Sequence, residues 1–171
     1  MDKKIEKALN EQIKEEFYSA YLYLSMSAWA ENNGFKGAGN WLRIQFQEEE
    51  AHGLHFYDFI KDRGGEVSLQ ALPAPGHKWK NLLDLFEAVK NHEKEVTKRI
   101  NDLYSLAFDS KDHATSTFLH WFVTEQVEEE KNVQEIIDQL KMVGDNGSGL
   151  YLIDKEMATR VFVAPTFGVT Q

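Results

Sequence analysis

The residues of this chain best suited to chemistry are polar side chains that interrupt apolar stripes at four places. They are Glu16, Glu49 with His52, Glu93, and Gln126 with Glu129. No Lys or Arg lies on these stripes, and an unpaired buried carboxylate costs several kcal/mol. Such a group must stay partly protonated or bind cations. Carboxylate oxygens with a single imidazole nitrogen favour iron or manganese, and zinc is also possible.

The spacing of Glu49 and His52 supports a metal site. Residues three apart share one face of a helix. A Glu-x-x-His pair, with inward glutamates on other helices, is the arrangement of di-iron carboxylate sites in helical bundles. A single glutamate in a long helix more often faces solvent, and the glutamate runs 48–50 and 128–130 leave the register ambiguous. Four interruptions at matched height favour a buried site over four surface glutamates.

The elements that must position these residues are long helices. Apolar residues recur at alternating spacings of four and three, which is typical of helices packed along one edge. The clearest stripe contains Leu82, Phe86, Val89, Glu93, Val96, Ile100, Leu103 and Ala107. The pattern predicts helices over 4–32, 36–63, 81–108 and 113–143, and a short fifth helix over 150–160. Each interruption lies near the midpoint of its helix, so all four should meet at one height.

The connections between these helices predict the topology. Short turns join the first helix to the second and the third to the fourth, which makes two antiparallel hairpins. The second and third helices are separated by about 17 residues, which reach ~56 Å when extended, while a helix of about 29 residues is ~44 Å long. The sequence therefore predicts an all-α, antiparallel four-helix bundle with one long crossover. We expect a single domain over 1–171, with the bundle over 4–143 and a C-terminal tail over 161–171.

The amino-acid composition excludes several classes of site and partner. The 171 residues carry a net charge of −9 and contain no cysteine. The missing cysteines exclude disulfides, thiolate zinc sites, iron–sulfur clusters and rubredoxin-type modules. The acidic balance argues against nucleic-acid binding and suits a protein that concentrates cations. The N-terminus lacks the apolar core of a signal peptide, and no apolar run is long enough to span a membrane. We expect a cytoplasmic protein with no membrane partner.

Nearly the whole chain resembles the bacterial non-haem ferritins. The resemblance is carried by Gln47-Glu48-Glu49-Glu50-Ala51-His52 and by the segments 10–19, 26–29, 92–93, 125–131 and 149–156. It implies a ferritin-like bundle whose fifth helix closes the fourfold contacts of a shell of twenty-four identical subunits. It also implies iron storage. Fe²⁺ is oxidised at a di-iron ferroxidase centre by O₂ or H₂O₂ and is stored as a ferric oxyhydroxide mineral inside the shell.

The resemblance also implies roles for individual residues. Glu16, Glu49 and His52 match the ligands of the first iron. Metal-binding histidines usually donate from their second ring nitrogen, so we also expect a hydrogen-bond partner for that atom of His52. Glu49 bridges to a second iron, which Glu93 and Glu129 also bind. Gln126 matches a residue that hydrogen-bonds within the site, and Tyr23 matches the tyrosine beside it. A third iron position nearby falls on Glu48, Glu125 and Glu128, with Glu129 shared.

Two departures separate this sequence from the haem-binding bacterioferritins. Those proteins carry a haem-ligating methionine directly after the bridging glutamate, where this chain has Glu50. They also carry a second Glu-x-x-His, where this chain has Gln126 and Glu129. We therefore expect no haem. Two alternatives remain at this point, a catalytically inactive acidic shell or scaffold and a DNA-protecting miniature ferritin. The apolar tail could dock on a neighbouring subunit or line an internal cavity.

Overall fold

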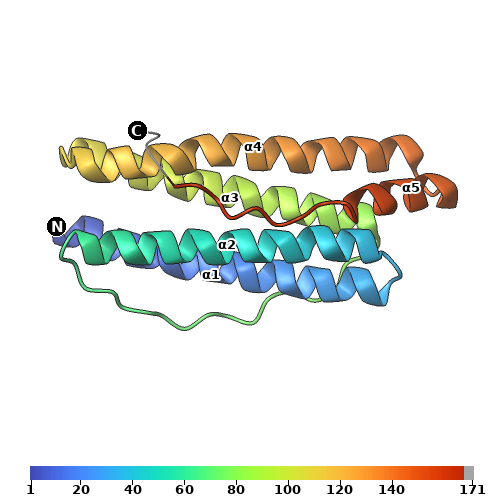
Figure 1. The fold of residues 1–171 in the computed structure, drawn as a ribbon, viewed down its shortest axis with the longest axis horizontal. Coiled ribbons are helices and arrows are strands. Elements are labelled where there is room, and N and C mark those ends of the chain that lie inside the picture. Colours follow the sequence, from blue (N-terminus) through green and yellow to red (C-terminus); the bar gives the residue numbers. More distant parts are fainter. Residues whose placement is uncertain (168–171) are drawn as a thin grey trace.

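The computed structural model describes residues 1–167 and contains five α-helices (Figure 1). They are α1 (Lys3–Asn32), α2 (Lys36–Asp62), α3 (Leu82–Asp109), α4 (His113–Val143) and α5 (Gly147–Met157). The predicted all-α bundle is confirmed, and the first four helices begin and end within one residue of the predicted bounds. Residues 168–171 of the predicted tail lie outside the described residues.

The fifth helix differs from the prediction, because it begins and ends three residues earlier than the expected range of 150–160. The cause is Asn146, whose side-chain oxygen accepts a hydrogen bond from the backbone N–H of Gly149 at 2.9 Å. This N-cap draws the glycine-rich segment into the first turn of α5. From the sequence alone, the glycines at 144, 147 and 149 indicated a turn that ends before the fifth helix begins.

The topology is that of two antiparallel hairpins joined by a crossover. Helix α1 packs against α2, and α3 packs against α4. The segment 63–81 runs back along the length of the bundle, so α3 starts at the end where α2 started (Figure 1). The predicted long crossover is confirmed. Gly34, with φ of 88°, occupies the short turn between α1 and α2, where a side chain would be strained.

Most helix starts are capped by a side chain from the same segment, but α2 is capped by α5. Its N-cap residue, Phe35, makes no side-chain hydrogen bond. The carboxylate of Asp154 in α5 instead accepts the backbone N–H of Ala38 at 2.9 Å. The two helices approach so closely that a Cβ at Gly37 would lie 1.6 Å from the carbonyl oxygen of Asp154. This contact holds α5 across the end of the bundle.

The core consists of two apolar clusters with a polar band between them. One cluster, at the end where α5 lies, includes Met26, Leu42, Phe86, Leu140 and Ile153. The other, at the opposite end, includes Leu9, Phe56, Ile100, Leu119 and Phe122. All six interrupting residues of the sequence stripes are buried in the band between these clusters. The helices thus meet through apolar contacts at both ends and present polar side chains to one another only in the middle.

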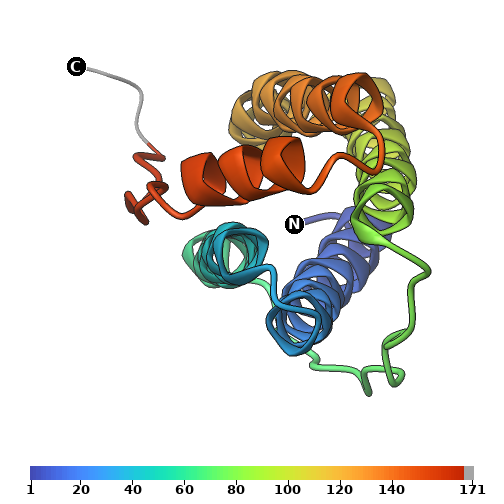
Figure 2. The same cartoon turned by 90° about the vertical axis from the view of Figure 1, so that its right-hand side faces the viewer.

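Helix α5 and the segment after it lie on the side of the bundle formed by α2 and α4 (Figure 2). The chain then runs back along that side and past the middle of the bundle (Figure 1). Within residues 1–167, none of the helices is both long enough and apolar enough to cross a membrane.

Candidate metal centre

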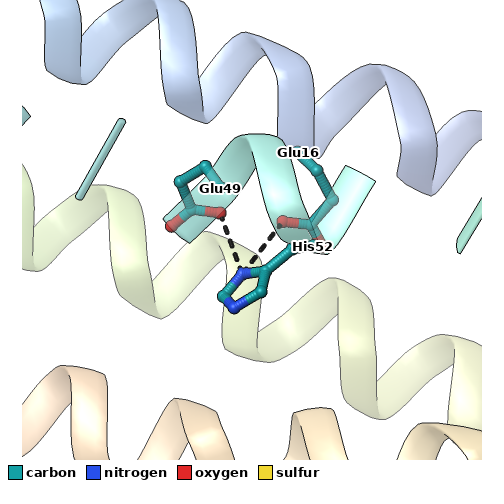
Figure 3. Close-up of side chains that lie close together, drawn as sticks. All are labelled: Glu16, Glu49 and His52. Carbon is teal, nitrogen blue, oxygen red and sulfur yellow. Dashed lines mark hydrogen bonds and ion pairs between the residues drawn. The ribbon is translucent and has the colours of Figure 1, made fainter. Parts of the chain in front are cut away.

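Glu16, Glu49 and His52 form a compact group of potential metal ligands (Figure 3). Glu16 comes from α1, and the other two residues come from adjacent turns of α2. The Nδ1 atom of His52 lies 3.3 Å from Oε2 of Glu49 and 4.0 Å from Oε2 of Glu16. The three ligand atoms lie within 4.8 Å of one another, and all three side chains are buried. This geometry allows one small cation to contact two carboxylates and an imidazole together.

Glu93 and Glu129 lie in the same polar band, on α3 and α4. Glu93 accepts hydrogen bonds from the Tyr23 hydroxyl and, at 3.0 Å, from the side-chain amide of Gln126. Glu129 accepts a hydrogen bond at 3.0 Å from the side-chain amide of Gln45. Each donor is neutral, so these contacts orient the carboxyl groups without supplying a positive charge.

Burial and mutual repulsion shift the acid–base behaviour of the whole group. Burial raises the pKa of Glu16 and Glu49 well above the usual value of 4.5, and the charges of neighbouring glutamates raise it further. Burial and the charge of Glu93 do the same to the pKa of Glu129. Burial also raises the pKa of Glu93, but the hydrogen bonds from Tyr23 and Gln126 oppose that shift. The metal-free site therefore holds protons that a cation can displace.

His52 is oriented by its surroundings on both sides of the ring. Its Nδ1 atom faces the carboxylates, while Nε2 has no hydrogen-bond partner among residues 1–167. The rings of Trp121 and Phe122 lie edge-on to the imidazole, with centroids 5.3 and 5.7 Å away. The expected partner for the second ring nitrogen is therefore not found in the described part of the chain.

The three residues expected to form an outer position lie together on the α2 and α4 side, but they do not join the compact group. Glu48 and Glu125 are partly buried and Glu128 is exposed. Burial raises the pKa of both Glu48 and Glu125, and the charge of Glu128 adds to the shift at each. The guanidinium of Arg160 lies 2.7 Å from Glu48. We call Glu48, Glu125 and Glu128 the outer carboxylates.

Sequence reasoning missed the glutamines that support the ligands, and it missed Arg160. The side-chain amide of Gln12 donates to Glu16 at 2.8 Å, and Gln45 supports Glu129. Gln12 lies one helical turn before Glu16, and a glutamine at that spacing is a signal for a side chain that orients a ligand. Gln45 donates to Glu129 of another helix, so its spacing from Glu49 does not indicate its partner. Arg160 carried no such signal, because its partner lies 112 residues away.

Comparisons with known proteins all match ferritins. Residues 6–143 match the family model of the Ferritin-like domain. The chain is 42% identical to a bacterial non-heme ferritin of Staphylococcus saprophyticus, over 95% of this chain and 97% of that one. It is 41% identical to a bacterial non-heme ferritin of Campylobacter jejuni, over 91% and 93%. An open pore ferritin of Archaeoglobus fulgidus superposes with a TM-score of 0.93 at 45% identity, over 94% and 99%.

Proposed function

The chain belongs to the ferritin-like family, and from this premise we propose that it stores iron by oxidising Fe²⁺ at the buried site between its four helices. The substrate is Fe²⁺ and the oxidant is O₂ or H₂O₂. Two Fe²⁺ ions give up one electron each. O₂ accepts both electrons with two protons and leaves as H₂O₂, whereas H₂O₂ accepts them with two protons and leaves as water. The ferric product is stored as a hydrated oxide inside a shell of identical subunits.

The observation that carries this proposal is the compact group formed by Glu16, Glu49 and His52. Two buried carboxylates face one imidazole nitrogen, and the neutral side-chain amide of Gln12 donates to Glu16. Hard oxygen donors with a single nitrogen suit iron and bind Fe³⁺ better than Fe²⁺, which makes the bound ferrous ion a better reductant. Their negative charge also balances the charge that oxidation adds.

We assign the remaining roles by position in the band. Glu16 and His52 hold the first iron, Glu49 bridges to the second, and Glu93 with Glu129 completes the second position. Gln126 and Tyr23 orient Glu93 through the hydrogen bonds described above. The outer carboxylates form a third and weaker iron position, because water competes with ligands at partly exposed carboxylates.

The test is aerobic Fe²⁺ oxidation followed at the ferric absorbance with two irons per subunit. Glu49→Ala removes the bridging ligand and should slow the fast phase by at least about a hundredfold, because ligands act as a unit in positioning both reactants. Glu50→Ala is the matched control, since a one-residue step turns the side chain about 100° around the helix. It should oxidise iron at the parental rate.

A parental initial rate in Glu49→Ala would contradict the site assignment. A parent protein that forms shells and binds Fe²⁺, yet oxidises it no faster than buffer, would instead indicate an inactive acidic shell. Anomalous scattering from a crystal soaked in Fe²⁺ locates the bound ions independently of the rate.

A further inference from the structure

The segment after α5 closes over the α2 and α4 side of the bundle. We call residues 158–167 the strap. It leaves the end of α5 and runs back along the bundle, past its middle (Figure 1). Two side chains anchor it, Arg160 near its start and Phe167 near its end. Both anchors fall beside residues that the proposed function assigns to iron.

Arg160 is held by contacts on three sides. Its Nη2 atom donates to Oε2 of Glu48 at 2.7 Å, and its guanidinium lies over the ring of Trp41, 4.5 Å from the centroid. The backbone carbonyl of Arg160 accepts a hydrogen bond from the side-chain amide of Asn40 at 3.0 Å. Only 23% of the Arg160 side chain is exposed. Stacking and hydrogen bonds together make this an ordered charge rather than a free surface arginine.

Phe167 anchors the other end beside the outer carboxylates. Its ring stacks on His55, with centroids 3.8 Å apart and planes 15° from parallel. It also packs edge-on against Trp121 at 4.7 Å. Phe167 and Glu125 line the same surface pocket on α4. The strap therefore passes from one outer carboxylate, Glu48, to the neighbourhood of another.

We propose that Arg160 is an internal counter-cation of the outer carboxylates, which a metal ion must displace in order to bind there, and that the strap sets the affinity of that position. A cation within 2.7 Å of Glu48 neutralises one of the three charges that would attract the metal. It also blocks one of the oxygens that would bind it. This inference rests on the proposed function, because it concerns the third iron position assigned above.

The electrostatics of the site agree with this geometry. The guanidinium lies 2.7 Å from Glu48, and like charges repel, so it disfavours a metal ion at the same carboxylate oxygens. Arg160 contacts Glu48 directly, and within the described residues no hydrogen bond or ion pair joins it to Glu16, Glu49 or His52, so its strongest effect falls on the outer carboxylates.

The test uses Zn²⁺, which binds the same ligand types and does not change oxidation state. The assembled, metal-free protein is titrated by calorimetry, which separates a tight class of Zn²⁺ sites, the buried pair, from a weak class, the outer carboxylates. Arg160→Gln removes the charge and should tighten the weak class about fivefold, the effect of one partly exposed ion pair. Arg160→Lys keeps the charge and should stay near the parent. Lys155→Gln, on the exposed face of α5, is the matched control for lost charge and should leave both classes unchanged.

Phe167→Ala tests the strap without touching the charge. Freeing this end lets Arg160 leave Glu48 more often, so the weak class should tighten in the same direction and by less. A weak class that stays unchanged or loosens in Arg160→Gln would overturn the role of Arg160. An unchanged weak class in Phe167→Ala would overturn the role of the strap. If the parent itself lacks the tight class of Zn²⁺ sites, the proposed function is wrong. The same titration therefore distinguishes a failure of the proposed function from a failure of the role of Arg160.

Discussion

At the scale of single residues, the site combines side chains that stabilise one another poorly in the absence of metal. Glu129 illustrates this. It is 4% exposed, it accepts one hydrogen bond from the neutral Gln45, and it is repelled by Glu93. Burying a charge in this way lowers stability unless a cation or proton compensates it. The group is therefore arranged for binding at the expense of the stability of the metal-free fold.

Replacing Glu129 by Gln should reveal that cost. Gln keeps an oxygen that can accept from Gln45 and removes the repulsion with Glu93. We expect the thermal midpoint of the metal-free protein to rise by about 3 °C, which corresponds to roughly 1 kcal/mol at this chain length. The added stability conferred by Zn²⁺ should shrink. Glu135→Gln, on the exposed face of α4, is the control and should change neither quantity. A large fall in the metal-free midpoint would mean that Glu129 has a structural role.

The raised carboxyl pKa values also predict a pH dependence. Glu16, Glu49 and Glu129 have folded-state pKa values well above 4.5, so the folded protein binds more protons than the unfolded chain above that pH. Their contribution to the metal-free unfolding free energy is therefore largest below pH 4.5 and falls as pH rises through the folded-state pKa values. Metal ions must displace these protons, so metal affinity should fall as the pH is lowered.

Proton release measures this displacement directly. Zn²⁺ added to the metal-free protein near pH 6 should release protons, which calorimetry in two buffers of different ionisation enthalpy counts. The release should be smaller in Glu129→Gln, which has one fewer carboxyl group to deprotonate. Binding without proton release would show that the carboxyl groups are already ionised in the metal-free protein.

Helix α5 is held against α2 by a side-chain cap and by a close approach of the two backbones. Asp154 caps the start of α2, and Gly37 allows the two backbones to approach closely. Because the strap continues from α5, this junction also sets where Arg160 reaches Glu48. A change at Gly37 should therefore act at two places, on the fold of α5 and on the outer carboxylates.

Gly37→Ala tests the junction. Its Cβ cannot lie 1.6 Å from the carbonyl oxygen of Asp154, so α5 must move away from α2. We expect a loss of roughly 1–3 kcal/mol of unfolding free energy, the usual cost of overpacking. Gly147→Ala, at the start of α5, meets no atom within 4 Å and serves as the control. Equal thermal midpoints for the two variants would show that α5 is not held at this junction.

At the scale of the whole molecule, the bundle separates stability from chemistry. Two apolar clusters close its ends, and the polar band lies between them. Substitutions in the band can therefore alter metal binding while both clusters remain packed. The described chain also exposes large apolar side chains, such as Leu54, Leu69, Val127 and Tyr151. Several of these on different faces are consistent with burial against identical subunits in a shell.

The number of subunits in the assembled particle can be measured directly. We expect the purified protein to sediment as a closed particle with twenty-four times the mass of the chain, and light scattering gives that mass without a shape assumption. The metal-free and Glu49→Ala proteins should give the same particle, because the site lies inside each subunit. A dimer at micromolar concentration would contradict the shell.

The helices, their order and the six polar residues that interrupt the apolar stripes can be predicted from the sequence alone. Alternating spacings of four and three located the buried face of each helix, and the length of the crossover decided the topology. The polar residues were recognisable because they break those stripes near four helix midpoints, as Glu93 does between Val89 and Val96. These features are local or depend only on chain length, so they can be read from one sequence.

The tertiary structure alone decided how distant segments meet. Asp154 capped a helix 116 residues away, and Arg160 reached Glu48 across 112 residues. No periodicity encodes such pairs, because each depends on how the end of the bundle and the returning chain are placed in space. The hydrogen bond from Tyr23 to Glu93 follows the same rule, since the two residues lie 70 residues apart and meet only once the two hairpins have packed.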